Sequence, residues 1–181
     1  MEKLIKNLEK DIRKIIRGEE VEPIREEIGD KVDIRLVRMI VFSLQEASTG
    51  YKSALRFAGM KLGKKIGTSS GKSEISLVLD EIKTIIETLD GGKVEIKISD
   101  TKREASLLIS YCYLGYETPD TEHSLCYFEE GFIEGYIEGV INRLGSLAVA
   151  EKENGVTKVN VDEVKCYGRG DEICEFVIRF N

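Results

Sequence analysis

The chain has 181 residues, of which 41% are hydrophobic and 33% are charged, and its net charge is −6. This length supports one domain with a hydrophobic core, and the acidic balance argues against general nucleic-acid binding. No apolar run approaches the roughly 20 residues that cross a bilayer, and the N-terminal segment lacks the apolar block of a signal peptide. We therefore expect a cytoplasmic globular protein that binds neither nucleic acid nor a membrane.

The charges are distributed unevenly. Residues 1–72 carry 16 basic and 11 acidic side chains, whereas residues 73–181 carry 11 and 22. The simplest interpretation is that the two parts attract each other or a second copy of the chain. A functional basic patch around Lys61, Lys64, Lys65 and Lys72 is the alternative.

The first predicted element is an amphipathic helix over residues 3–17, because its apolar residues recur on one helical face and Gly18 follows. A terminal helix of this kind packs either on its own domain or on a second copy. We assign residues 1–24 to an N-terminal helical extension and residues 25–181 to the main domain. Asp33 is the expected N-cap of a helix over residues 34–47.

Two further predicted helices, over residues 51–66 and 122–144, carry glycines at four-residue spacing. A glycine inside a helix costs roughly 1 kcal/mol relative to alanine, so the face that carries the glycines must gain something in return. Close helix packing and a groove for a ligand are both compatible with the pattern. The glycines are Gly59, Gly63, Gly67, Gly131, Gly135 and Gly139.

The segment Gly67–Ser73 resembles a phosphate-binding loop but is one residue short of that motif. A phosphate-binding loop follows a buried strand, whereas this segment follows a charged helical stretch. We therefore predict a connection to the next helix, over residues 73–89, and no nucleotide site.

Alternating apolar residues predict strands over residues 94–98, 105–111, 147–150, 156–164 and 173–180, with an Asn154-Gly155 turn. The order is helices first and then β-β-α-β-β-β. This order predicts an α+β fold in which an antiparallel sheet packs against helices.

The densest group of potential ligands is Glu163, Cys166 and Cys174, which flank a glycine-rich turn at residues 168–171. The arms of such a hairpin bring the two thiols together. Cys126 is expected in the first turn of the helix over residues 122–144, where the helix dipole favours thiolate. Three sulfurs and a carboxylate suit zinc, and the usual motifs of zinc-activated water are missing. We therefore expect structural zinc.

Several alternatives stay open for these side chains. A Cys166–Cys174 disulfide is compatible with the spacing, and His123 could replace Cys126 as a ligand. Cys112 has no ligand partner nearby in the sequence, which favours a buried inert thiol. Lys165 and Arg169 could offset part of the negative charge of the ligand set.

Residues 126–136 and 161–176 resemble the 4-vinyl reductase domain, whose archaeal branch is described as predicted hydrocarbon-binding proteins. Residues 29–38 and 55–67 resemble the first part of that domain, so the likeness covers roughly residues 25–180. The resemblance implies the α+β fold of ligand-binding domains in nitric-oxide sensors and Golgi-transport complexes. It also implies a homodimer that holds a small apolar or aromatic molecule between helices and sheet.

In similar phenol-sensing domains, zinc is held by three cysteines and a glutamate. Residue by residue, the resemblance places these ligands on Cys126, Glu163, Cys166 and Cys174. The expected function is therefore a stand-alone, zinc-containing, homodimeric binding or sensor domain for a hydrocarbon or aromatic ligand. Four aromatic residues could border its pocket: Phe57, Phe128, Phe132 and Tyr136.

Two other functions compete with this one. The family name suggests an enzyme or accessory protein in vinyl-group reduction on a tetrapyrrole, but the sequence carries no dinucleotide fingerprint or flavin motif. A purely structural assembly subunit is the third hypothesis. We lean towards a protein that is not an enzyme.

Overall fold

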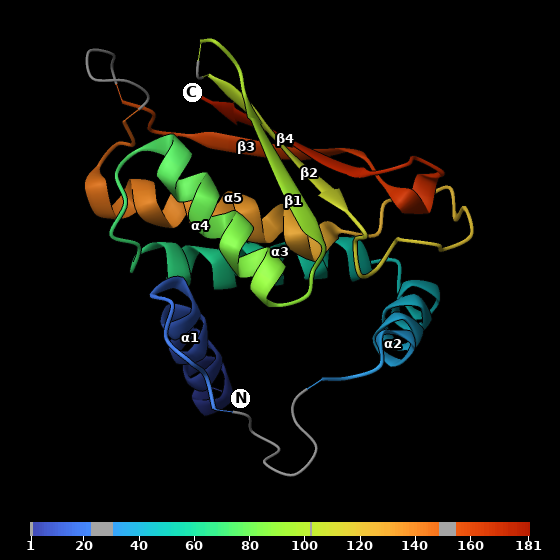
Figure 1. Ribbon diagram of the computed structural model, residues 1–181. Helices are drawn as coiled ribbons and strands as arrows, with labels where there is room; N and C mark the ends of the chain where they lie inside the picture. The colour runs from blue at the N-terminus through green and yellow to red at the C-terminus, as the bar shows by residue number, and fades with distance from the viewer. Residues whose placement is uncertain (1, 23–30, 102, 149–154) are drawn as a thin grey trace.

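The computed structural model describes residues 2–22, 31–101, 103–148 and 155–181 (Figure 1). Within these ranges, helices and a single antiparallel sheet form an α+β fold, as the order of the predicted elements indicated. The elements are α1 (Glu2–Ile16), α2 (Ile34–Ala47), α3 (Tyr51–Gly67), α4 (Ile75–Thr88), β1 (Lys93–Ile98), β2 (Glu104–Ser110), α5 (Tyr127–Leu144), β3 (Val159–Lys165), a 3₁₀ turn (Tyr167–Arg169) and β4 (Cys174–Phe180).

The sheet has the strand order β1-β2-β4-β3, and every neighbouring pair is antiparallel. The last strand therefore lies in the middle of the sheet, between β2 and β3. Alternate residues of β4 are buried, as expected for a strand with one face against the core. This arrangement brings the start of β4 next to the end of β2 and the end of β3.

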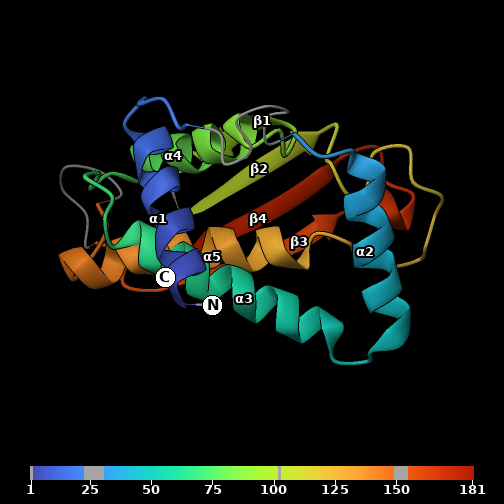
Figure 2. The ribbon, with the colours of Figure 1, turned by 90° about the horizontal axis from the view of Figure 1, so that it is seen from below.

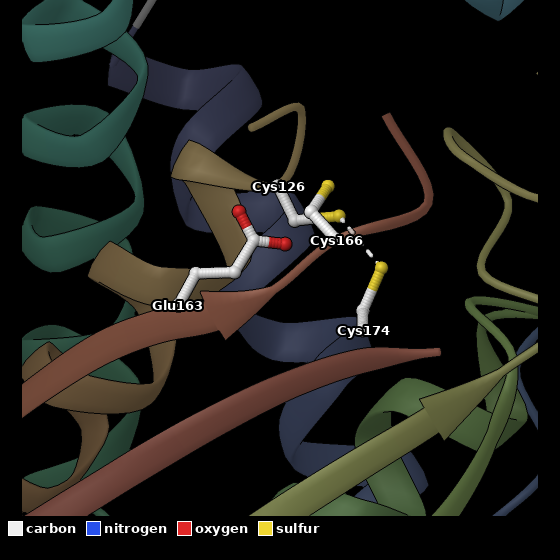
Figure 3. A group of neighbouring side chains, drawn as sticks. All are labelled: Cys126, Glu163, Cys166 and Cys174. Carbon is white, nitrogen blue, oxygen red and sulfur yellow. Dashed lines mark hydrogen bonds between the residues drawn. The ribbon is translucent and has the colours of Figure 1, made fainter. Parts of the chain in front are cut away.

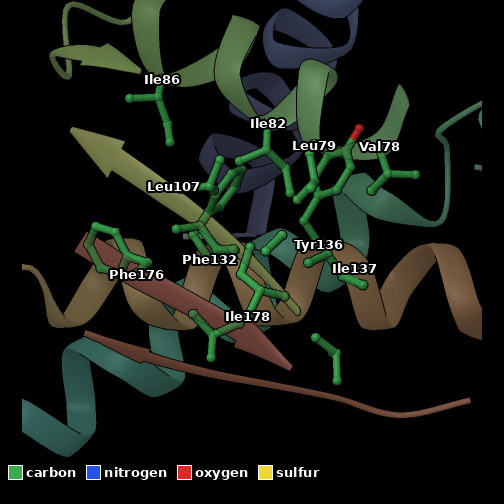
Figure 4. Close-up of a cluster of buried hydrophobic side chains, with 14 of the residues drawn as sticks. Val78, Leu79, Ile82, Ile86, Leu107, Phe132, Tyr136, Ile137, Phe176 and Ile178 are labelled. Carbon is green, nitrogen blue, oxygen red and sulfur yellow. The ribbon is translucent and has the colours of Figure 1, made fainter. Parts of the chain in front are cut away.

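Helix α5 lies between the sheet and α3, and α4 covers the same face of the sheet beside α5 (Figures 1 and 2). The core fills the space between α4, α5 and the sheet (Figure 4). Leu79 and Ile82 of α4 meet Leu107 of β2 and Phe176 of β4 there, and all four are fully buried. Because α5 is buried on several sides, its sequence lacks the single polar stripe of a surface helix.

The glycines of α3 and α5 face each other across the closest contact in the fold. A Cβ on Gly135 would overlap the carbonyl oxygen of Met60, and one on Gly63 would overlap that of Phe132. The other four glycines of the pattern meet backbone of the facing helix in the same way. The glycine pattern is therefore explained by backbone-to-backbone packing, because the facing helix fills the groove that a ligand would need.

A partly buried ion pair joins the same two helices to the sheet. Arg56 of α3 donates hydrogen bonds to Glu130 (2.9 Å) and Glu134 (2.6 Å) of α5. The Glu134 carboxylate also accepts a hydrogen bond from the backbone N–H of Val161 in β3 (3.3 Å). Burial raises the pKa of Glu134, while the charge of Arg56 acts in the opposite direction. Three elements are thus held at fixed positions beside the site described below.

The two N-terminal helices contact the rest of the fold to different extents. Ile12 of α1 is buried in the core cluster and Ile16 packs against it, so α1 lies on its own domain. Asp33 caps α2 by accepting a hydrogen bond from the backbone N–H of Arg35, as predicted. No residue of α2 is fully buried, and the helix projects from one end of the molecule (Figure 2).

Two boundaries differ from the sequence prediction. The helix predicted from Glu122 begins at Tyr127, because Glu122 has a positive φ of 60° that a helix does not allow. The strand predicted over residues 147–150 is reduced to isolated bridges from Leu147 to Val156 and from Ala148 to Glu74. Residues 149–154, including part of the predicted turn, lie outside the described residues.

None of the helices in the described part of the chain is long and apolar enough to cross a lipid bilayer.

The contact between α3 and α5 predicts a large effect of a bulky side chain at Gly135. Because Gly135→Leu must push Met60 and its backbone away, we expect the free energy of unfolding to fall by about 3 kcal/mol or more. Gly71→Leu is the control, since a Cβ there meets nothing within 4 Å. Urea denaturation followed by circular dichroism measures both. Equal stability of the two variants would contradict the packing role.

Candidate metal centre

Three separate parts of the chain bring four potential ligands to one point. Cys126 is the N-cap residue of α5, Glu163 lies near the end of β3, and Cys166 and Cys174 flank the turn between β3 and β4. The Sγ atoms and one carboxylate oxygen of these residues all lie within 4.8 Å of one another. Figure 3 shows how the four side chains gather from these elements. Cys126 therefore completes the cluster, and His123 is exposed outside it.

The turn between β3 and β4 places its two thiols by local backbone geometry. The pairing of β3 with β4 becomes irregular between Glu163 and Lys165, so the strand departs from simple alternation where the ligands begin. Gly170 ends the 3₁₀ turn in the left-handed conformation, with φ of 81°, which glycine adopts readily. The backbone N–H of Cys166 donates a 2.7 Å hydrogen bond to Asp171 and closes the turn.

The loop between β2 and α5 is fastened to this turn. Thr121 contacts the carbonyl oxygen of Gly168 through both its backbone N–H and its hydroxyl, each at 2.8 Å. The Asp120 carboxylate accepts a hydrogen bond from the backbone N–H of Glu122 (2.8 Å), which explains why this segment forms a turn rather than the first turn of the helix. Cys126 therefore remains at the positive end of the α5 dipole, at its N-cap.

Glu163 carries the clearest sign that a cation belongs here. Both of its carboxylate oxygens are buried, and neither has a hydrogen-bond partner among the described residues. Burial raises its pKa to about 9, and the neighbouring Cys166 thiol adds to the shift. A buried carboxylate without a partner is costly, so a positive ion between it and the thiols fits the residues present.

The thiols form a hydrogen-bonded group in which some act as donors and others as acceptors. Cys126 and Cys174 donate to Cys166 and hold its pKa far below the usual range. The pKa of Cys126 is raised, first by its hydrogen bond to Cys112 and then by that to Cys166. The backbone N–H of Leu125 also donates to the Cys166 sulfur at 3.3 Å. The site thus favours thiolate at Cys166, the form that binds metals.

Cys112 joins this group, which the sequence did not indicate. Its Sγ lies 3.3 Å from that of Cys126, whereas the Cys126 and Cys174 sulfurs are 3.7 Å apart. All four cysteines are buried and free, so the alternative of a Cys166–Cys174 disulfide is wrong. The prediction of a buried residue at position 112 is confirmed, but Cys112 is in contact with the site.

The charged side chains around the cluster are mostly paired with one another. Lys165 forms an ion pair with Glu175 (2.9 Å) and Arg169 lies 3.8 Å from Asp171. Glu129 of α5 has a buried oxygen without a hydrogen-bond partner among the described residues. Burial and the neighbouring Cys112 raise its pKa to about 7.

The four aromatic residues predicted to border a pocket occupy different environments. Phe128, Phe132 and Tyr136 follow one another along α5, with ring centres 6.4 and 6.0 Å apart. Phe132 and Tyr136 are buried, whereas Phe57 is 55% exposed and lies under the Lys61 ammonium group. None of the four lines the hollow of about 800 Å³ beside α1 and α4 or the hollow of about 720 Å³ beside β1.

Three thiols and one carboxylate at this spacing could hold a metal ion. Zinc sites with four protein ligands are closed and structural, whereas catalytic sites keep one position for water. With all four side chains bound, the ion would connect the start of α5 to both arms of the β3–β4 hairpin.

Comparison with known proteins identifies the fold and the domain. Residues 109–180 match the family model of the 4-vinyl reductase domain. An uncharacterized protein of Methanocaldococcus jannaschii, MJ0150, is 25% identical over 178 residues, which cover 98% of this chain and 91% of the relative.

Solved structures show the same architecture. A vinyl-4-reductase family protein from Methanocaldococcus jannaschii has 16% identity, covers 100% of this chain and 97% of its own, and has a TM-score of 0.59. Trafficking protein particle complex subunit 3 from Naegleria fowleri, covalently bound to palmitic acid, has 19% identity, coverages of 84% and 97%, and a TM-score of 0.57. The phenol-responsive sensory domain of the transcription activator PoxR, with phenol, has 12% identity, coverages of 86% and 78%, and a TM-score of 0.59.

At these identities the structures establish the fold alone, and the family match identifies the part of the chain that holds the cysteine cluster. Residues 109–180 of this chain therefore form a 4-vinyl reductase domain, as the resemblance of residues 126–136 and 161–176 indicated.

Proposed function

We propose that this protein is a cytoplasmic, homodimeric binding module for a small hydrocarbon or aromatic molecule, stabilised by a structural zinc ion. The observation that carries the proposal is the convergence of three buried thiols on a carboxylate whose buried oxygens have no hydrogen-bond partner among the described residues. The family match covers the residues of this cluster, in a chain with a ligand-binding fold.

Zinc is the metal that best suits the ligand set. Thiolates are soft ligands, and zinc accepts a mixture of sulfur and oxygen in tetrahedral geometry without redox chemistry. Glu163, Cys166 and Cys174 are brought together by one hairpin, and Cys126 comes from the start of α5. The ion would therefore replace the contacts that a larger core would otherwise supply between α5 and the end of the sheet.

The proposal of an apolar ligand rests on the row of aromatic rings along α5. Phe128 is partly buried, and Phe132 and Tyr136 are buried near α4 and β2. Two proteins of similar fold were solved with palmitic acid and with phenol, and a ligand between α5 and α4 would lie against these rings. Phe57 is exposed and would contribute only at an opening to the surface.

The homodimer is proposed to form through α2. Four large apolar side chains of this helix are 46–60% exposed: Leu36, Met39, Ile40 and Leu44. An apolar surface of this kind on a helix with no buried residue is typical of a protein interface. A second copy of the same helix would cover it.

The zinc proposal predicts the metal content of a cysteine variant. Wild-type protein should carry about one zinc ion per chain, and Cys174→Ser should lose most of it because a thiolate ligand is removed. Cys112→Ser, which also changes a buried cysteine, should keep the ion. Inductively coupled plasma mass spectrometry on dialysed protein measures all three. A wild type without metal, or a Cys174→Ser variant with the wild-type content, would contradict the proposal.

The ligand proposal predicts that an apolar molecule accompanies the purified protein. Denaturation and organic extraction, followed by gas chromatography–mass spectrometry, should release it from the wild type. Phe132→Trp should reduce the yield because the larger ring occupies the space beside Tyr136, whereas Phe57→Trp should change it little. Extracts that match the buffer blank, or equal yields from both variants, would count against this pocket.

The dimer proposal predicts the mass in solution. Wild-type protein should elute at about twice the chain mass of 20.4 kDa, and Ile40→Glu should shift it to the monomer because the charge lies in the apolar contact. Leu89→Glu changes a leucine that is 53% exposed elsewhere on the surface and should leave the dimer intact. Light scattering after size-exclusion chromatography distinguishes the outcomes. A monomeric wild type, or an unaffected Ile40→Glu dimer, would refute the α2 interface.

A further inference from the structure

Cys112 is placed beside the metal centre by an unusual backbone conformation. Along β2, the odd-numbered residues Ala105, Leu107 and Ile109 point into the core. The same alternation would bury Tyr111 and expose Cys112. Instead, Tyr111 has a positive φ of 56° and is 55% exposed, while Cys112 is 1% exposed. A non-glycine residue in this conformation is uncommon, and its effect here is to turn a thiol towards the cluster.

The position of Cys112 matches that of a metal ligand. Two sulfurs on one tetrahedral zinc, each about 2.3 Å from the ion, lie about 3.8 Å apart. The Cys112 and Cys126 sulfurs are 3.3 Å apart, and the Cys126 and Cys174 sulfurs are 3.7 Å apart. Cys112 is therefore within about half an ångström of the spacing that a shared ion requires, without a change in the fold.

The site thus contains five potential ligand groups for an ion that takes four. Cys126, Cys166 and Cys174 supply three sulfurs, and the fourth position can be filled by either Glu163 or Cys112. Both lie in contact with the three thiols: Glu163 through its place in the cluster, and Cys112 through hydrogen bonds with Cys126 and Cys174.

We propose that Cys112 is an alternative fourth ligand, which replaces Glu163 and converts a three-sulfur, one-oxygen site into a four-sulfur site. This inference rests on the proposed metal site. Exchange of a hard oxygen for a soft sulfur would favour softer ions such as Cd²⁺ over zinc. It would also release the Glu163 carboxylate from the ion while the other three sulfurs hold the metal in place.

A set of four proteins tests the exchange: wild type, Cys112→Ser, Glu163→Gln and the double variant. Competition with a chromophoric chelator gives the dissociation constant for Zn²⁺, and circular dichroism confirms that each protein is folded. Each single variant should bind Zn²⁺ close to the wild-type affinity, because the other residue fills the fourth position. The double variant should bind at least about tenfold more weakly, since only three sulfurs remain.

Substitution with Co²⁺ provides a second measurement that reports the ligands directly. The sulfur-to-cobalt charge-transfer absorption should be stronger in Glu163→Gln than in Cys112→Ser, because the former gains a fourth cobalt–sulfur bond. If Glu163→Gln binds Zn²⁺ as weakly as the double variant, or if the double variant keeps the wild-type affinity, Cys112 is not a ligand and the inference fails. The zinc proposal would survive that result, whereas a wild type that binds no metal would overturn both.

Discussion

The close contact between α3 and α5 fixes the geometry on which the rest of the fold depends. Glycines line this contact, so the two backbones touch and α5 can be covered on one side by α3 and on the other by the sheet. The contact sets where α5 begins, and Cys126 lies at that point. The Arg56 ion pairs with Glu130 and Glu134 fix the rotation of the same helix pair and connect it to β3. A helix held in this way can present a ligand to a hairpin that is distant in the sequence.

The second constraint is electrostatic. Buried thiols with a tendency to ionise and a carboxylate without a partner among the described residues cannot be brought together cheaply in a low-dielectric core. A divalent cation reverses the sign of that interaction, because each negative ligand then contributes to stability. The metal would connect the end of β3 and the start of β4 to the start of α5. This connection explains why the four side chains come from ends of elements rather than from their middles.

Much of this arrangement follows from the sequence. The hairpin spacing of Glu163, Cys166 and Cys174 predicts their proximity, and the glycine spacing predicts a close helix contact. The start of α5 and the position of Cys112 could not be predicted in the same way. Glu122 and Tyr111 both adopt positive φ, which tertiary contacts impose and local preference does not reveal. The exposure of a helical phenylalanine likewise depends on how α3 rotates against α5, since the sequence pattern is the same whether that face is covered or free.

The central claim is that one zinc ion connects α5 to the hairpin through cysteine sulfur. X-ray absorption at the zinc edge, recorded on purified wild-type protein, tests it most directly because it counts the sulfurs around the ion. The account predicts a first shell with three sulfurs at about 2.3 Å and one oxygen at about 2.0 Å. A shell of nitrogen and oxygen alone, or a protein that yields no zinc edge, would contradict it.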